Sequence, residues 1–215
     1  MIGKSITFNS LVLGAFALCT AGIVALTHDA TDDKIVAAKQ QAAQAALAEV
    51  IPADQHDNDL FNDTLAVAAE YRDTLGLTSP EDSGKKIHLA KSGQQTVAAI
   101  IPTTAKDGYS GDIKMILGVY RDGTIAGLRV TEQHETPGLG DYIDIKKGNW
   151  ILSFNGKDIH SNFDNRDEIN PATGEKFDQL TGATITRKAV TRQVLKTLTY
   201  FENAKPIETL SNSQP

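Results

Sequence analysis

The sequence predicts an α+β protein in which an N-terminal transmembrane helix precedes an antiparallel sheet packed with helices, including a long C-terminal helix. Three observations support this prediction. Residues 6–26 contain no charged side chain. Residues 86–131 alternate between strand-like runs and turn residues. Residues 185–203 place apolar side chains at helical spacing. The length of 215 residues allows one domain besides the hydrophobic segment.

Composition excludes some classes of function. The net charge is −6, and no stripe of Lys and Arg stands out, which argues against binding of nucleic acid. The single cysteine, Cys19, lies inside the hydrophobic segment. The remainder of the chain therefore has no thiolate for a disulfide or an iron–sulfur cluster.

Residues 6–26 are long enough to cross a membrane. As a helix they extend about 30 Å, which is the thickness of the hydrocarbon core of a bilayer. Lys4 flanks one end, while Asp29, Asp32 and Asp33 follow the other. The positive-inside rule then places the N-terminus in the cytoplasm. We expect residues 1–27 to be a single-pass membrane anchor.

Two alternatives to an uncleaved anchor stay open. A signal peptide has a shorter apolar core and a cleavage site of small residues, and Ala25-Leu26-Thr27 fits such a site poorly. A lipoprotein carries small residues before its modified cysteine, whereas Leu18 precedes Cys19. The uncleaved anchor is the favoured interpretation.

Residues 28–84 are predicted to form a juxtamembrane helix and an acidic connecting region. The alanine-rich stretch 34–50 favours a helix, which Asp32 or Asp33 would cap and Pro52 would end. Residues 53–83 are polar and acidic, and we expect a loop with at most one helical turn there.

Residues 85–205 are predicted to form the main domain. An antiparallel meander is expected, in which the Asp-Gly pair at 122–123 supplies the positive φ angles of a hairpin turn. Residues 141–170 are polar and mixed apart from the apolar run 150–154, and the tail 206–215 is predicted to be disordered. The expected strands are 86–91, 95–101, 114–120 and 124–131.

The first chemical motif is Asp-Gln-Leu-Thr-Gly-Ala-Thr at 178–184, directly before the C-terminal helix. This order places the Thr184 hydroxyl near the helix N-cap, where backbone N–H groups and the helix dipole favour a phosphate. Gly182 permits a close approach of the backbone, and the Asp178 carboxylate could hold a metal or bind a modifying enzyme's substrate complex. Taken alone, the motif is also typical of a plain turn and helix cap.

The second motif, Glu-Gln-His-Glu-Thr-Pro-Gly-Leu-Gly, occupies 132–140 after a predicted strand. Pro137 and Gly138 favour a turn, and a loop that contains Glu135, Thr136 and two glycines can present N–H groups and hydroxyls to a planar polar ligand or its phosphate. No second histidine lies at ligand spacing from His134, so a zinc site is not expected.

With these motifs in this order, the chain resembles the G subunit of the Rnf (Rsx) electron-transport complex. It is also similar to the C subunit of the sodium-pumping NADH:quinone reductase, which is typically longer. The resemblance covers nearly the whole chain. Its parts are the membrane helix 6–26, Gly-Tyr-Ser-Gly at 108–111, Asp-Gly at 122–123, His-Glu-Thr-Pro-Gly-Leu-Gly at 134–140, and the motif at 178–184.

The resemblance implies FMN joined covalently through its phosphate to Thr184 by a flavin transferase outside the cytoplasm. Residues 85–205 would then be an FMN-binding domain. Thr181, Gly182, Ala183 and Asp178 would surround the phosphate. The residues expected to line the ring or the ribityl chain are Glu135, Thr136, Leu139 and Gly140. Tyr109, Tyr142 or Trp150 would cover the ring, although an aromatic residue more often belongs to the core.

The resemblance also implies a location and partners. The chain would be a subunit of a redox-driven ion translocase in the bacterial inner membrane, with a periplasmic main domain, other membrane subunits as partners, and no catalytic turnover of its own. One rival is a membrane-anchored extracytoplasmic binding or assembly module without a cofactor. A hydrolase is a weaker rival, because Ser110 lacks the glycine pattern of a nucleophile elbow.

Overall fold

Five strands follow one another in the same order along the chain and across a single antiparallel sheet. The computed structural model describes residues 2–161 and 181–207. Its strands are β1 (Thr64–Ala66), β2 (Lys86–Ser92), β3 (Gln95–Gly108), β4 (Gly111–Tyr120) and β5 (Ile125–Glu132). Its α-helices are α1 (Ile2–Val50) and α2 (Thr181–Ala204), and its short 3-10 helices are η1 (Ala69–Tyr71), η2 (Pro80–Gly84), η3 (Asp141–Ile143) and η4 (Trp150–Phe154). The predicted α+β class is confirmed.

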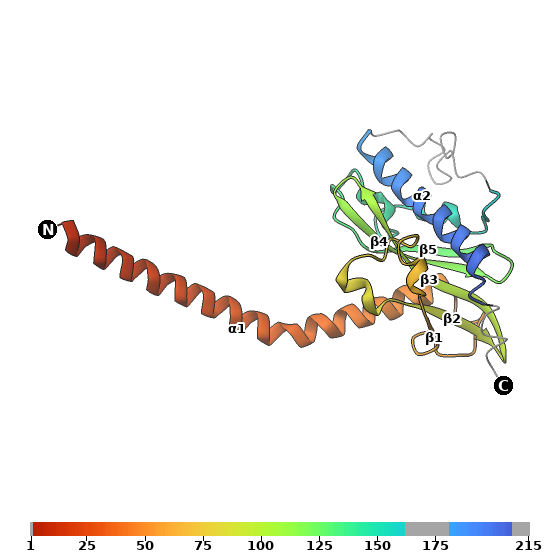
Figure 1. Ribbon diagram of the computed structural model, residues 1–215, viewed down its shortest axis with the longest axis horizontal. Coiled ribbons are helices and arrows are strands. Elements are labelled where there is room, and N and C mark those ends of the chain that lie inside the picture. Colours follow the sequence, from red (N-terminus) through yellow and green to blue (C-terminus); the bar gives the residue numbers. More distant parts are fainter. Residues whose placement is uncertain (1, 162–180, 208–215) are drawn as a thin grey trace. The chain divides into compact units, whose positions relative to one another are not determined.

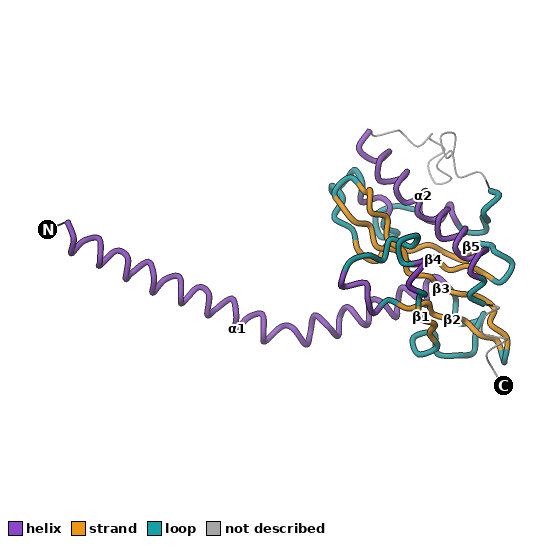
Figure 2. The backbone as a smooth tube through the Cα atoms, viewed as in Figure 1, coloured by secondary structure: helices purple, strands orange, loops and turns teal. Residues whose placement is uncertain are grey.

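The chain divides into two units, Met1–Ala43 and Gln44–Pro215. The described part of the first unit is helical and contains an apolar segment long enough to cross a membrane. The second unit contains the sheet, with α2 packed across one of its faces (Figure 1). Figure 2 shows the same arrangement, with α2 in purple against the orange strands.

The sheet is buried on both faces. Because successive side chains of a strand point to opposite faces, Ala99 and Ile101 of β3 join the large core beneath α2, whereas Ala98 and Ile100 join a smaller core on the other face. Leu47, from the last turns of α1, belongs to the smaller core. This two-sided burial explains why β3 reads as a continuous apolar run.

One helix spans the region where the sequence predicted an anchor and a separate helix at 34–50. α1 runs without interruption from Ile2 to Val50, so the predicted cap at Asp32 or Asp33 is wrong. No glycine or proline separates the two stretches. The hydroxyls of Thr27 and Thr31 donate to carbonyls four residues earlier, so both side chains find a hydrogen-bond acceptor within the continuous helix.

Two further expectations need correction. Residues 53–83 contain strand β1 and two 3-10 helices instead of a loop with one helical turn.

Strand β3 continues past Pro102 to Gly108, beyond the predicted end at residue 101. The N–H of Thr104 donates to the Leu75 carbonyl and so points away from β4. Backbone groups two residues apart in a strand point the same way, and Pro102 therefore removes no hydrogen bond between β3 and β4. The hairpin turn at 122–123 is confirmed, but of the Asp-Gly pair only Gly123 has a positive φ, at 90°, so the prediction that both residues supply such an angle is wrong for Asp122.

The C-terminal helix is confirmed, but its start and its buried face differ from the prediction. α2 begins at Thr181 rather than 185, and Ile185, expected on the apolar stripe, is exposed. The core continues beyond α2 to Ile207, and residues 208–215 of the predicted tail lie outside the described part of the chain. The residues of α2 that are buried are Thr186, Ala189, Val190, Gln193, Val194, Thr197, Leu198, Tyr200 and Phe201.

Candidate functional site

The first turn of α2 carries the threonine that the sequence singled out. Thr184 is the fourth residue of the helix, so it lies inside the first turn and not at the N-cap as predicted. Its side chain is partly exposed. Residues 181–183 are helical in backbone, and Asp178 lies outside the described residues. Thr184 is therefore close to the end of the helix where orphan N–H groups favour an anion.

A buried carboxylate joins this turn to two other segments. Glu135, in the loop after β5, is 5% exposed. Its Oε2 accepts a 2.6 Å hydrogen bond from the hydroxyl of Thr186 on α2, and its Oε1 accepts a 3.1 Å bond from the N–H of Ser110 at the tip of the β3–β4 hairpin. Its own N–H donates to the Gln133 side chain at 2.6 Å. Loop, helix and hairpin tip thus meet at one side chain.

Two glycines make room for this carboxylate. A Cβ at Gly140 would lie 2.7 Å from Oε2 and 2.8 Å from Cβ of Glu135. A Cβ at Gly108 would lie 2.9 Å from Oε1. These separations are too short for real carbon contacts, so glycine is required at both positions while Glu135 occupies this place.

The loop itself is folded by its own hydrogen bonds. The N–H groups of Leu139 and Gly140 donate to the carbonyl of Thr136. The buried Asp141 accepts a 2.7 Å bond from the N–H of Gly138. Thr136 is exposed. The predicted turn at 137–138 is therefore formed, and one face of the loop remains accessible.

Exposed apolar side chains lie close in sequence to the residues that meet at Glu135. Tyr109, next to Ser110, is 61% exposed. Leu139, Tyr142 and Ile185 are also exposed, and each lies within two residues of Gly140 or Thr186. In the described part of the unit Gln44–Pro215, the only other large hydrophobic side chain that is exposed is Leu152. Large apolar groups on three segments thus face solvent around the first turns of α2.

Trp150, the third candidate to cover a ring, belongs to the core. It is 3% exposed and packs edge to face on Phe154 at 5.1 Å between ring centroids. The guanidinium of Arg187 lies 5.6 Å from the centroid of its ring. Burial lowers the pKa of Arg187, but a guanidinium remains charged in proteins. Trp150 therefore packs against the Arg187 guanidinium inside the domain and is not exposed at the surface to cover a ring.

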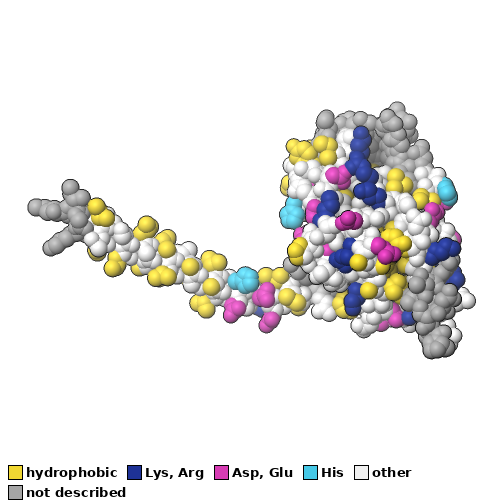
Figure 3. Space-filling view, in the orientation of Figure 1, with side chains coloured by type: hydrophobic (Ala, Val, Ile, Leu, Met, Phe, Trp, Pro, Cys, Tyr) yellow, Lys and Arg dark blue, Asp and Glu magenta, His cyan; other side chains and the backbone are white. Residues whose placement is uncertain are grey.

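The beginning of α2 is electropositive. Its first turn contains no acidic residue, and Arg187, Lys188, Arg192 and Lys196 precede its one carboxylate, Glu202. Figure 3 shows basic side chains over the end at which α2 begins. Arg187 and Lys188, the first charged side chains of the helix, follow Thr184 by about one turn, and the positive end of the helix dipole also favours an anion there. Helix and side chains together therefore suit a phosphate.

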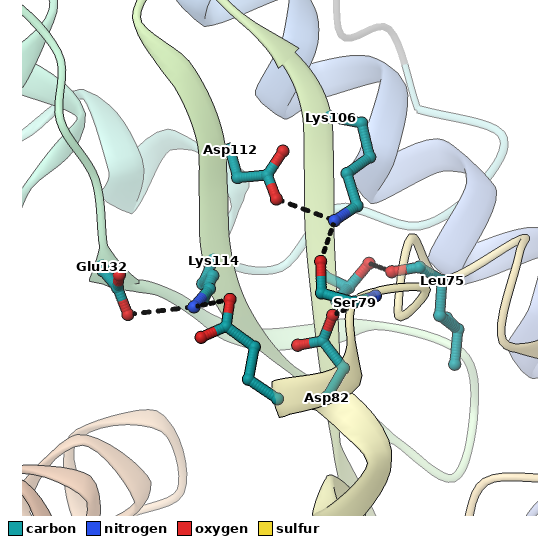
Figure 4. A network of polar contacts seen from close by, with 9 residues as sticks. Leu75, Ser79, Asp82, Lys106, Asp112, Lys114 and Glu132 are labelled. Atoms are coloured by element: carbon teal, nitrogen blue, oxygen red, sulfur yellow. Dashed lines mark hydrogen bonds and ion pairs between the residues drawn. The ribbon is translucent and has the colours of Figure 1, made fainter.

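Ion pairs hold the hairpin behind its tip. Across β3 and β4, Lys106 donates to Asp112 at 2.7 Å and to the Ser79 hydroxyl at 3.0 Å (Figure 4). Lys114 lies 2.8 Å from Glu81 and 3.2 Å from Glu132, and the Glu81 carboxylate raises the pKa of Lys114.

A further pair ties the hairpin to α2. Asp107, next to the tip, pairs with Arg192 of the helix. The hairpin is thus fixed to η2 on one side and to α2 on the other. Among the described residues, no three His, Cys, Asp or Glu side chains are grouped to hold a metal, and His134 is exposed.

The sequence missed three residues of this arrangement. In the sequence, Ser110 stands out only as a candidate nucleophile and as part of the run at 108–111, and Gly108 only as part of that run. An apolar stripe that begins at Ile185 leaves out Thr186. Thr186, Ala189, Val190 and Gln193 share one face at i, i+3, i+4 and i+7, but two of these four residues are polar, so hydropathy alone gives no signal for this face.

Family models and individual relatives match the chain. A model described as FMN-binding domain matches residues 108–199, and one described as RnfG N-terminal region matches residues 1–50. A protein of Shewanella amazonensis, described as the G subunit of an ion-translocating oxidoreductase complex, is 40% identical over 92% of this chain and 88% of its own length. Proteins of the same description from Vibrio atlanticus and Yersinia pestis are 41% and 39% identical, over 92% and 94% of this chain and 90% and 93% of their own lengths.

Proposed function

Because the chain belongs to the family of G subunits of ion-translocating oxidoreductase complexes, we propose that it carries electrons through an FMN group esterified to Thr184. The resemblance that the motifs indicated is confirmed at the level of this family. The observation that carries the proposal is the position of Thr184. Thr184 is partly exposed in the first turn of a helix that carries no acidic residue there and whose first charged residues are Arg187 and Lys188.

The charges at this end of α2 suit a phosphodiester. An ester at the Thr184 oxygen keeps one negative charge beside the helix N-terminus, where Arg187 and Lys188 follow within one turn or so. Thr181, Gly182 and Ala183 are the adjacent residues, and we assign them to the surroundings of the phosphate. The bound flavin supplies the redox chemistry, while the protein supplies the tether, the orientation and the local charge.

The exposed apolar residues suit a planar ring. Tyr109, Leu139, Tyr142 and Ile185 lie on the three segments that meet at Glu135. Burying them against an aromatic ring would remove apolar surface from water. We assign Tyr109 and Leu139 to the ring and Thr136 to the polar side of the ligand, whereas Gly140, which is buried against Glu135, supports the loop. Trp150 has no place in this contact because it is buried.

The orientation of the membrane anchor determines on which side of the membrane the flavin domain lies. The apolar part of α1 would cross the bacterial inner membrane once, with Lys4 on the cytoplasmic side and the domain in the periplasm. In this arrangement the flavin lies outside the cytoplasm, where a flavin transferase attaches it. The domain then exchanges electrons with the other membrane subunits of the complex.

The test is the intact mass of full-length protein purified from membranes of a host with an active flavin transferase. We expect the wild type and Thr199→Ala, an exposed threonine of the same helix, to carry the mass of one FMN group. Thr184→Ala should have the bare polypeptide mass, no fluorescent band on a denaturing gel, and an unchanged melting temperature. A flavin band in Thr184→Ala, or a bare mass for the wild type, would refute the attachment.

A further inference from the structure

We propose that Glu135 is a positioning residue for the attachment of flavin at Thr184. Its carboxylate fixes the first turns of α2 against the hairpin tip, and it does not itself contact the ligand. The inference rests on the proposed function, since it concerns how the ester at Thr184 is formed. It also revises the expectation that Glu135 lines the flavin.

Both oxygens of Glu135 are used by the protein. Oε2 is occupied by the Thr186 hydroxyl and Oε1 by the Ser110 N–H, and the side chain is almost entirely buried. The bare backbones of Gly108 and Gly140 close against the carboxylate. A ligand at the surface would therefore contact the hairpin tip and the first turns of α2, but not the Glu135 carboxylate.

Helix geometry separates Thr186 from Thr184. Two residues apart on an α-helix, their side chains differ by about 200° around the axis. Thr186 is fully buried and faces Glu135, so Thr184 is directed to the other side, in accord with its partial exposure. The carboxylate thus acts on Thr184 through the backbone of the turn. It fixes how far the Thr184 hydroxyl stands from the hairpin tip.

This position matters for the reaction that forms the ester. Thr184 Oγ1 would bond to the FMN phosphorus of a flavin dinucleotide as the bond to the bridging diphosphate oxygen breaks. A nucleoside monophosphate then leaves, and the hydroxyl proton passes to solvent. The hydroxyl must be presented to the transferase in one orientation, and small displacements of a reacting group are costly in rate. A first turn no longer held by Glu135 would slow this step.

Glutamine distinguishes positioning from chemistry at this site. In Glu135→Gln the amide oxygen can still accept from the Ser110 N–H, and the amide nitrogen can donate to the Thr186 hydroxyl, which is able to accept. The shape and both bonds are retained while the negative charge and the basicity are lost. Glu135→Ala removes both bonds, and Thr186→Val removes one.

The experiment measures the initial rate of FMN incorporation by intact mass. Full-length, flavin-free protein in detergent is mixed with a purified flavin transferase and flavin dinucleotide, well below the melting temperature of every variant. Glu132→Ala serves as the matched control, because this exposed carboxylate lies three residues before Glu135. We expect Glu135→Ala to be slowed about tenfold or more, Thr186→Val to be slowed less, and Glu135→Gln and Glu132→Ala to stay within about threefold of wild type. The pH profile of Glu135→Gln should match that of wild type.

Other outcomes overturn the inference. A wild-type rate in Glu135→Ala would show that the turn needs no support from the carboxylate, even if its melting temperature falls. A Glu135→Gln variant as slow as Glu135→Ala would assign the carboxylate to the chemistry. If Glu135→Ala does not fold, unchanged rates in Thr186→Val would decide against the inference. Wild-type protein that never gains flavin would refute the attachment at Thr184 itself, and the positioning role with it.

Discussion

Gly118 on β4 lies directly opposite Gly127 on β5, and Val50 packs onto the bare backbone that this pair leaves. A Cβ on Gly127 would lie 3.2 Å from the Val50 carbonyl oxygen, and one on Gly118 would collide with a Val50 methyl group. Next to Val50, the buried Arg129 donates to the side chain of Glu49 at 2.9 Å and to its carbonyl at 3.1 Å. The end of α1 is therefore fixed to the sheet face opposite α2 by shape and by hydrogen bonds.

Gly118→Ala should destabilise the domain. The added methyl group overlaps Val50, and overpacking of this kind costs about 1–3 kcal/mol. Urea unfolding of the full chain in detergent measures the loss. Gly84→Ala is the matched control, because a Cβ there meets open space.

Val50→Ala in the Gly118→Ala background tests the same contact. The shorter side chain should recover part of the lost stability, so that the two changes are not additive. Equal stabilities for Gly118→Ala and Gly84→Ala would contradict the packing described here.

Thr103→Val should weaken the contact between α2 and the sheet. The Thr103 hydroxyl accepts from the Gln193 amide at 2.7 Å, donates to the Leu75 carbonyl at 3.2 Å, and lies 2.9 Å from the Thr197 hydroxyl. The side chains of Thr103, Gln193 and Thr197 are all buried, so the substitution leaves polar groups unpaired at a cost of about 1–3 kcal/mol. Urea unfolding of the full chain measures this cost.

Thr199→Val is the control for this prediction. Thr199 is exposed on the same helix, and its hydroxyl bonds only back to Leu195 among the contacts described. Its loss should change the free energy of unfolding by about 0.5 kcal/mol or less. A Thr103→Val protein as stable as Thr199→Val would show that these buried hydrogen bonds do not hold α2.

Tyr200 should make the domain sensitive to alkali. Burial, with a contribution from Tyr71, raises the pKa of Tyr200 to about 12. The phenol of the unfolded chain ionises near pH 10, so the unfolded state loses its proton first. The stabilisation is therefore complete below about pH 10 and is lost as the pH rises towards 12, by about 2 kcal/mol.

Tyr200→Phe should remove this part of the alkaline loss, which unfolding at several pH values would detect. The tyrosinate absorbance of Tyr200→Phe should also lack the group with a pKa of about 12. Tyr109→Phe, at an exposed position, should leave the alkaline slope as in wild type. Equal slopes for wild type and Tyr200→Phe would be evidence against a shifted phenol.

Local patterns made much of the fold predictable. The uncharged run at 6–26, the Asp-Gly turn and the apolar spacing of 185–203 each act over a few residues, and the structure confirms the elements they indicate. Boundaries were less predictable. α1 continues through the polar stretch 27–33, and a proline in β3 is accommodated because its missing N–H faces away from β4.

The buried polar residues of α2 were not predictable in the same way. Thr186 and Gln193 lie on the buried face of α2, where apolar side chains are expected. Each can be buried because it forms a hydrogen bond with a residue distant in sequence, Glu135 or Thr103. Glu135, the partner of Thr186, is also buried by contacts with residues distant in sequence, although a glutamate on a turn is expected in solvent.

Composition and short spacing were enough to specify the apolar N-terminal helix, the order of the main elements, and the two motifs that indicate the family. Three-dimensional packing was needed to establish that Glu135 points inward to Thr186 and Ser110, that Trp150 lies in the core, and that Tyr109 stays at the surface. Those outcomes depend on contacts between residues far apart in the chain. The free energy of such contacts depends on which groups are buried against one another, and the order of residues along the chain does not contain that information.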